Sequence, residues 1–278
     1  MNWREYEQEV FEELRRRYPD ALVTRDTTLP GRMSQTSRQI DVLIEAHVFD
    51  TPIRIVVDAK RHGRSLDVND VESFVSMIAD VGAHRGLLVS SSGYTAAAAA
   101  RAHRETNQDI ELDVLTLEEL KHLQGTLALP FSGAHGVVLP APFGWVVDAQ
   151  RREGAVACLY QRGYDLQAAG QAKEWMYLNF WHKDSDAPDL DGLLKLQSKT
   201  LHDATISYFP GVERRDARTA IRLAEVPGCP TPEYTGFVEF SDFIFFAVLF
   251  TTPEMSKRNV RKLREILRTV VPMTVRHV

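Results

Sequence analysis

Cysteine is scarce in this chain, and its scarcity argues against two kinds of small, cross-linked fold. Of the 278 residues only Cys158 and Cys229 are cysteines, and they form no CxxC pair and no cluster with histidine. The sequence therefore indicates neither a disulfide framework nor a structural zinc site. This cysteine usage favours a reducing, cytoplasmic location.

Long apolar runs are missing as well. The longest run, FIFFAVLF at 243–250, is far too short to cross a bilayer as a helix. The N-terminal stretch MNWREYEQEVFEELRRRYP is charged throughout and contains no apolar core of signal-peptide length. We therefore predict neither export nor a membrane role.

The sequence also lacks an excess of basic residues, since its formal net charge is −5. This charge argues against a protein that coats nucleic acid, although carboxylates gathered at a metal ion would contribute to it. We find no Ser/His/Asp order, no P-loop and no dinucleotide-binding glycine pattern. What is present is 44% hydrophobic and 26% charged residues, which is typical of a soluble globular protein.

The hydrophobic pattern predicts two domains. Residues 1–126 read as a helix, three strands, a helix, a strand, a helix, a strand and a helix, which together make an α/β domain with a mixed sheet. Residues 127–143 are rich in Pro, Gly and small residues, and we interpret them as a linker. Residues 144–278 predict an α+β domain with an antiparallel sheet, whose role in specificity, regulation or oligomerisation stays open.

Two neighbouring segments of the first domain read as central strands. They are QIDVLIEAHV at 39–48 and IRIVVDAK at 53–60. Both have apolar residues on each face near their centres, as strands covered on both sides do. The residues FDTP at 49–52 predict the turn that joins them. The two strands are therefore expected to form a hairpin.

This hairpin is expected to bring two acids and a lysine together. Side chains alternate along a strand, so Asp58 and Lys60 lie on one face of the second strand. Antiparallel pairing places Asp41 opposite Asp58, opposite Lys60 or between the two, depending on the register. Directly opposed residues have Cβ atoms roughly 4.5–5.5 Å apart. Two carboxylates and an ammonium group then share a small volume.

Carboxylates this close repel each other unless a cation lies between them. Mg²⁺, with Mn²⁺ as a substitute, prefers oxygen ligands and keeps several waters, so Asp41 and Asp58 would suit it. It would hold a phosphodiester oxygen and activate a water for attack. Lys60 could orient or deprotonate that water or stabilise charge on the phosphate. The alternative is a plain cross-strand ion pair between aspartate and lysine.

A glutamate on the first helix lies where an apolar residue is expected. Residues 3–17 predict a helix whose apolar stripe includes Tyr6, Val10 and Leu14, and Glu7 projects near the middle of this stripe. If the helix packs across the sheet, Glu7 could reach the same metal ion directly or through water. Equally, it could extend from the edge of the stripe into solvent or pair with an arginine.

Together these segments resemble the PD-(D/E)XK nuclease superfamily, and within it the Mrr-like restriction endonucleases. The resemblance covers about residues 3–120 and rests on the helix acid, QIDVLI, VVDAK and DVESFVSMIADVGAHRGLLVSSSGYTAAAAARA. It implies a restriction-endonuclease-like fold that cuts DNA with Mg²⁺. It also implies that Asp41, Asp58 and Glu7 are metal ligands and catalytic acids, and that Lys60 is the catalytic lysine.

Two positions depart from the family pattern. Ile40 stands where the name of the motif has proline, and Asp58 replaces the glutamate that is more usual in the Mrr-like group. A shorter acid reaches less far, so the number of metal ions and the preferred metal stay open.

Five polar residues near these strands are candidates for substrate binding: Gln39, Arg61, His62, Arg64 and Ser91. Gln39 could hold a metal ligand or a phosphate, or be only a polar residue at a strand edge. The basic residues after the second strand could contact the DNA backbone or form a solvated loop. The segment SSSGYT opens a helix whose free N–H groups could meet a phosphate, and a capped turn explains it equally well.

The sequence as a whole predicts a Mg²⁺-dependent DNA endonuclease, with a role in restriction or other genome defence that rests on family analogy alone. Two other functions stay open. One is a non-cleaving nucleic-acid-binding or sensor protein that uses the nuclease-like fold as a platform, and the other is a repair or RNA nuclease. A homodimer is expected for a double-strand cutter, because cutting both strands usually needs two active sites. The basic helix at 256–271 could lie along DNA or be a solvated face.

Overall fold

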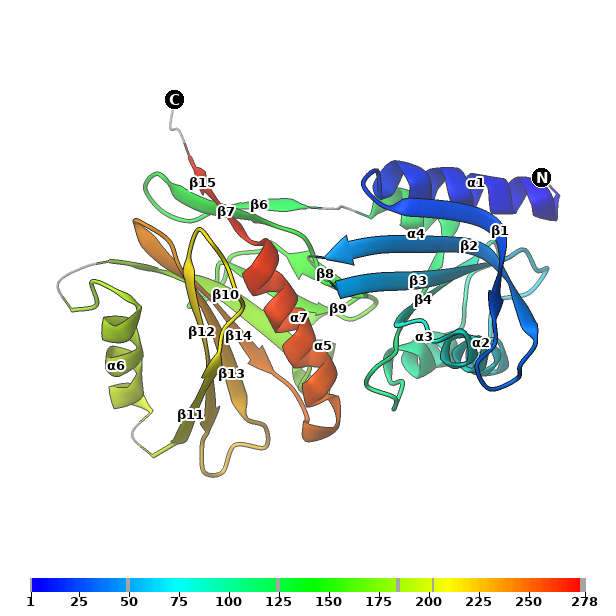
Figure 1. Cartoon of the computed structure of the whole chain (residues 1–278). Helices are drawn as coiled ribbons and strands as arrows, with labels where there is room; N and C mark the ends of the chain where they lie inside the picture. The colour runs from blue at the N-terminus through cyan, green and yellow to red at the C-terminus, as the bar shows by residue number, and fades with distance from the viewer. Residues whose placement is uncertain (1, 49–50, 124–125, 184–185, 202, 276–278) are drawn as a thin grey trace. The chain divides into compact units, whose positions relative to one another are not determined.

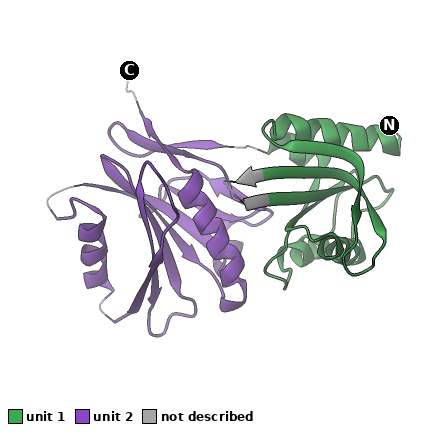
Figure 2. Ribbon diagram, viewed as in Figure 1, with its two compact units in different colours: residues 1–123 green, residues 124–278 purple. Residues whose placement is uncertain are grey.

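The computed structural model describes most of the chain, namely residues 2–48, 51–123, 126–183, 186–201 and 203–275. Contacts within the chain separate it into two units, Met1–Leu123 and Gln124–Val278 (Figure 2). The turn predicted at 49–52 includes residues 49–50, which lie outside the described residues.

In chain order, the elements of unit 1 are α1 (Trp3–Arg17), β1 (Leu22–Pro30), β2 (Ser37–Val48), β3 (Thr51–Lys60), α2 (Val68–Val81), β4 (Arg85–Ser90), α3 (Ala96–His103), β5 (Glu111–Thr116) and α4 (Leu117–His122). The five strands form one sheet in the order β1-β2-β3-β4-β5. Pairing is antiparallel from β1 to β3 and parallel from β3 to β5. Helices α1 and α4 cover one face of this mixed sheet, and α2 and α3 cover the other (Figure 1).

The helices of unit 1 begin and end where their sequences provide caps. Asn2 and Glu5 form a capping box at the start of α1, and Asp67 and Asp70 form another at the start of α2. Helix α2 ends at Gly82, whose φ of 64° is a left-handed conformation that glycine adopts readily. The predicted helix at 3–17 is confirmed.

The two central strands are buried on both faces. Val42 and Ile44 of β2 and Val56 and Val57 of β3 are all fully or almost fully buried. Successive residues of a strand point to opposite faces, so both faces must be covered by helices. Apolar helix residues such as Phe74 supply this cover on the α2 side. The hairpin that carries the acids is therefore packed in the core of unit 1.

The elements of unit 2 are β6 (Leu127–Pro130), β7 (His135–Leu139), β8 (Trp145–Asp148), β9 (Ala157–Gln161), α5 (Leu166–Ala172), β10 (Trp175–His182), α6 (Leu190–Thr200), β11 (Thr205–Pro210), β12 (Arg218–Glu225), β13 (Glu233–Glu239), β14 (Phe243–Phe250), the 3₁₀ turn η1 (Pro253–Met255), α7 (Ser256–Thr269) and β15 (Val271–Thr274). An antiparallel sheet has the order β11-β12-β13-β14-β10-β9-β8, and a smaller one has the order β15-β7-β6. This is the predicted α+β architecture.

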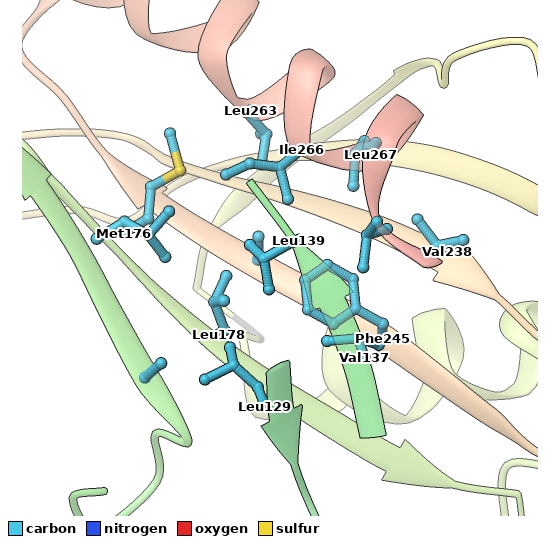
Figure 3. Packing of buried hydrophobic residues seen from close by; sticks show 14 of the residues in the cluster. Leu129, Val137, Leu139, Met176, Leu178, Val238, Phe245, Leu263, Ile266 and Leu267 are labelled. Atoms are coloured by element: carbon cyan, nitrogen blue, oxygen red, sulfur yellow. The ribbon is translucent and has the colours of Figure 1, made fainter. Parts of the chain in front are cut away.

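The main core of unit 2 lies between α7, the small sheet and one face of the large sheet (Figure 3). Leu263 and Leu267 of α7 pack against β13, where Gly236 leaves room for them. A Cβ on Gly236 would lie 2.8 Å from the nearest methyl carbon of Leu267. Helix α6 packs against the other face, with Leu190 and Leu193 buried. Unit 2 therefore has an apolar layer on both faces of its large sheet.

The interpretation of residues 127–143 as a linker is wrong. They contain β6 and β7, and Leu129, Val137 and Leu139 are buried in the unit 2 core. The proline and glycine residues of this segment lie mainly at the ends of two short strands and in the turn between them, and they do not form a flexible linker. Gly136 lies inside β7, where a Cβ would come within 2.6 Å of the Met273 side chain.

Several basic residues of α7 are engaged within unit 2. Arg258 and Lys262 are buried, and Lys262 Nζ donates a hydrogen bond to the Phe143 carbonyl at 2.6 Å. Arg264 donates to the carbonyls of Gly211 and Pro210, both at 3.3 Å. Lys262 and Arg264 thus satisfy backbone carbonyls of unit 2, whereas Lys257 and Arg268 of the same helix are exposed. Within the described residues, every helix is too short or too polar to cross a lipid bilayer.

Candidate active site

Asp58 and Lys60 lie side by side near the C-terminal end of β3. Lys60 Nζ is 2.7 Å from Asp58 Oδ2, so the two side chains share one face of the strand, as strand alternation predicts. Both side chains are partly exposed, with 34% of Lys60 and 14% of Asp58 accessible. The pair is therefore accessible from solvent.

Asp41 reaches this pair from the neighbouring strand. The ladder between β2 and β3 includes Val42 opposite Val57, and Asp41 and Asp58 are the next residues on their strands. Asp41 Oδ2 accepts a hydrogen bond from the backbone N–H of Ala59 at 2.8 Å. The side chain of Asp41 is thereby fixed beside the segment between Asp58 and Lys60.

The electrostatics of the three groups are strongly coupled. Burial, and then the negative charge of Asp58, raise the pKa of Asp41 to about 7, against the opposing effects of the Ala59 N–H and Lys60. Burial acts to lower the pKa of Lys60, but the charge and hydrogen bond of Asp58 outweigh it, so the pKa is raised. Lys60 is therefore a charged ammonium group at neutral pH.

Glu7 of α1 is a half-buried acid that is close enough to Asp41 to feel its charge. Burial raises its pKa, and the charge of Asp41 raises it further, while Arg25 and Arg4 act to lower it. Within the part of the chain that the structure describes, Glu7 forms no ion pair. The pairing with an arginine that its position allowed is therefore absent there, and the acid lies within electrostatic range of Asp41.

These residues fit a cation that takes few ligands from the protein. Among the described residues, no group of three or more His, Cys, Asp or Glu side chains is close enough to hold a metal ion. Glu7, Asp41 and Asp58 are thus not a closed three-acid cage. Mg²⁺ needs only one or two carboxylates when water and substrate phosphate complete its shell. Asp41 and Asp58 are hard oxygen donors whose mutual repulsion a cation would relieve.

Asp26 is a fourth acid beside the site, and we did not anticipate it from the sequence. The neighbouring residues of β1, Arg25 and Thr27, pair with Val42 and Ile40 on either side of Asp41. Asp26 has a φ of 49°, an uncommon left-handed conformation within a strand. Its negative charge helps to raise the pKa of Glu7. Periodicity reports strands and faces, and it carries no signal for such a local backbone distortion.

The residues predicted to bind substrate are placed in different ways. Gln39 is exposed, and its Nε2 donates to Asp26 Oδ1 at 3.0 Å. Arg61 and His62 are exposed directly after β3. Arg64 is engaged elsewhere, because its guanidinium binds Asp70 at 2.7 Å at the start of α2. This ion pair favours a structural role for Arg64 over a contact with DNA.

Ser91 lies in a turn that satisfies its own polar groups. The Ser91 N–H donates to the Lys60 carbonyl at 3.0 Å, and the Ser90 hydroxyl donates to the Gly93 carbonyl at 2.7 Å. Thr95 caps α3 by accepting the N–H of Ala98. The segment is therefore a capped strand-to-helix turn. Ser91 itself is exposed next to the end of β3.

The comparison with protein families decides what kind of domain this geometry belongs to. Residues 1–123, which are the whole of unit 1, match the restriction endonuclease family of the Mrr catalytic type. Unit 1 is therefore similar to the Mrr-like restriction endonucleases. The mixed sheet with helices on both faces, and the acids and lysine of β2 and β3, are thus parts of a Mrr-like domain.

The comparison with solved structures finds a distant likeness. The chain is similar to the solution structure of cyanobacterial PsbP (CyanoP) from Synechocystis sp. PCC 6803, with 9% sequence identity and a TM-score of 0.35. That alignment covers 53% of this chain and 92% of the other. A likeness this distant assigns no function. No curated protein matches the chain.

Proposed function

We propose that this protein is a Mg²⁺-dependent endonuclease that hydrolyses phosphodiester bonds of DNA at the site formed by Asp41, Asp58 and Lys60. The observation that carries the proposal is the meeting of these three groups on the β2–β3 hairpin of a Mrr-like domain. Mn²⁺ is expected to substitute for Mg²⁺. A role in restriction or other genome defence is part of the proposal and rests on the family alone.

The acids and the lysine of the site have different proposed roles because their charges differ. Asp41 and Asp58 would hold the metal ion, which when bound supplies a Lewis acid and an activated water. Because the pKa of Lys60 is raised, its ammonium group stabilises the negative charge that grows on the phosphate. A proton acceptor would need a neutral amine, so charge stabilisation is the better supported role of Lys60. Glu7, near Asp41, would act on the metal through water.

The substrate strand is proposed to lie across the end of β3. Arg61 and His62 are exposed directly after the site, where a cationic side chain can contact a backbone phosphate. Gln39 and Ser91 are exposed on the neighbouring segments and offer hydrogen bonds. We further propose that two copies act together when both strands are cut.

Plasmid cleavage tests the proposal. We expect the full chain to nick or linearise supercoiled DNA in Mg²⁺ and to leave it intact in EDTA. Asp58→Ala should lower the rate about 100-fold or more, as the loss of a charge-stabilising or metal-binding group does. Glu45→Ala removes a 3.0 Å ion pair with Arg54 on the same hairpin and should leave the rate unchanged. Cleavage that persists in EDTA, or in Asp58→Ala, contradicts the proposal.

A non-cleaving DNA-binding protein is the second candidate. The observation in its favour is the lack of a three-acid cluster among the described residues. The same assay separates the candidates, because this one predicts binding without cleavage in every divalent metal. Single-stranded DNA and RNA, offered in parallel, test the repair and RNA-nuclease alternatives. A preference for RNA would overturn the assignment to DNA.

A further inference from the structure

Unit 2 has a groove that its core does not use. It lies between α6 and β11, has a volume of about 620 Å³ and is lined by Asp191, Leu194, Lys195, Ser198, Lys199 and Tyr208. Helical spacing separates two surfaces of α6. Leu190 and Leu193 are buried against the sheet, whereas Lys195 and Lys199 are exposed and lie one turn apart.

The second wall of the groove is an edge strand. β11 is the first strand of the large sheet, and among the described residues it pairs with β12 alone. Tyr208 has 51% of its surface exposed, and its hydroxyl is 3.2 Å from the Ser198 hydroxyl of α6. The ring of Tyr208 therefore offers an exposed aromatic surface in the groove that Lys195 and Lys199 also line.

The charge of the groove is positive because its acid is already neutralised. Asp191 binds the Arg218 guanidinium through both carboxylate oxygens, at 2.9 and 2.6 Å. Lys195 and Lys199 form no ion pair and no hydrogen bond with other described residues. On a protein with a net charge of −5, two unpaired cations in one groove give a local positive potential.

We propose that this groove binds the phosphodiester backbone of DNA, so that unit 2 adds to the affinity for the substrate. The two lysines would each contact a phosphate, and the hydroxyls of Ser198 and Tyr208 would donate hydrogen bonds to phosphate oxygens. Tyr208 also offers an aromatic surface of the kind on which sugars and bases pack. The proposal rests on the proposed function, since it assumes that DNA is the substrate of unit 1.

Fluorescence anisotropy with labelled duplex DNA tests it, using the full chain in EDTA at several salt concentrations. Each lost phosphate contact should make the slope of log K against log salt shallower by about 1. Lys195→Gln/Lys199→Gln should therefore flatten the slope by about 2 and weaken binding about tenfold at low salt. The variant Lys195→Arg/Lys199→Arg, which keeps both charges, should retain the slope and the affinity of the wild type.

A matched control removes the same charge elsewhere on unit 2. Lys173→Gln/Arg215→Gln changes two exposed cations outside the groove and should leave affinity and slope unchanged. An unchanged slope in the groove variant overturns the inference, and so does an equal loss in the control.

The binding test of the groove and the cleavage test of the proposed function can fail independently of each other. Groove-dependent binding without cleavage in any metal would contradict the proposed function alone. Metal-dependent cleavage with unchanged binding by the groove variant would contradict the inference alone.

Discussion

The carboxyl group of Asp41 has its pKa raised to about 7, because it is partly buried and lies beside Asp58. A neighbouring N–H from Ala59 and the ammonium of Lys60 oppose this effect without cancelling it. In the absence of a metal ion, the proton therefore stabilises the folded protein at this position. A metal ion and a proton compete for the same oxygen atoms.

The stability of the metal-free protein should depend on pH through this residue. The folded-state pKa lies above the ordinary value of 3.8, so the stabilisation is fully present below about pH 4 and is lost as the pH rises through about 7. In EDTA, we subtract the melting temperature of Asp41→Asn from that of the wild type at each pH. This difference should decrease as the pH rises from about 5 to about 8. Thermal unfolding followed by circular dichroism measures this. Parallel curves for the two proteins would show that Asp41 does not titrate in this range.

Single residues were predictable from the sequence only where alternation or pairing fixed them. The shared face of Asp58 and Lys60 follows from strand alternation, and Asp41 follows from antiparallel pairing. Only 6% of Glu13 is exposed, and Arg17 and Arg16 of the same helix bind its carboxylate. Arginines on the same helix are close enough to cover an acid, and a hydrophobic periodicity does not register that.

At the scale of elements, the loop between β1 and β2 is held by one buried acid. Asp80 of α2 is 2% exposed and accepts the N–H groups of Met33 and Ser34, at 2.8 and 3.0 Å. It also accepts the Ser34 hydroxyl and the Arg38 guanidinium, both at 2.6 Å. The Ser34 hydrogen bonds, followed by that of Arg38, hold the pKa of Asp80 well below its usual range. The loop is thereby tied to the helix on the next layer.

Replacing this acid should open the loop. Asp80→Ala leaves two backbone N–H groups and a guanidinium without their acceptor, which disfavours the closed loop. We expect trypsin to cleave after Arg32 about tenfold faster in this variant, an estimate that corresponds to about 1.4 kcal/mol of easier local opening. Limited proteolysis with mass spectrometry identifies the cut. Glu72→Ala, on the exposed face of the same helix, should be cut as slowly as the wild type, and equal rates for all three would argue against the tether.

Elements with a strong period were predictable, and short or irregular ones were not. Helices α1 and α2 and the strands of the unit 1 sheet follow from the hydrophobic periodicity. Strand β12 has no clear apolar pattern, because RTAIRLAE carries Arg222, which is buried through hydrogen bonds to Gln197, Glu233 and Thr235. A buried arginine gives no apolar signal. Strands β6 and β7 were missed because their prolines and glycines resemble those of a linker.

At the scale of the whole molecule, each unit has a hydrophobic core of its own. Unit 1 packs α2 and α3 against its mixed sheet, and unit 2 packs α7 and α6 against the two faces of its large sheet. The large sheet of unit 2 draws its strands from residues 145–250, so long-range pairing determines it. Sequence patterns predict the class of such a sheet but not its strand order.

Removing a core side chain from unit 2 should destabilise that unit. Leu263 is fully buried, so Leu263→Ala should lower the free energy of unfolding by about 2–5 kcal/mol. Three of the four tryptophans, Trp145, Trp175 and Trp181, belong to unit 2, so denaturation followed by tryptophan fluorescence reports mainly on it. Val271→Ala, at an exposed position, should cost less than about 0.5 kcal/mol. Equal losses for the two variants would contradict the packing described for α7.

The proposed function as a whole depends on Lys60 acting on the reacting phosphate. The most direct measurement is the single-turnover rate of cleavage by Lys60→Ala, with saturating enzyme, DNA and Mg²⁺, beside wild type and the Arg54→Ala control. We predict a rate about 100- to 1,000-fold below wild type, with DNA affinity within about threefold and Arg54→Ala unchanged. A Lys60→Ala protein that cuts bound DNA at the wild-type rate would contradict this assignment.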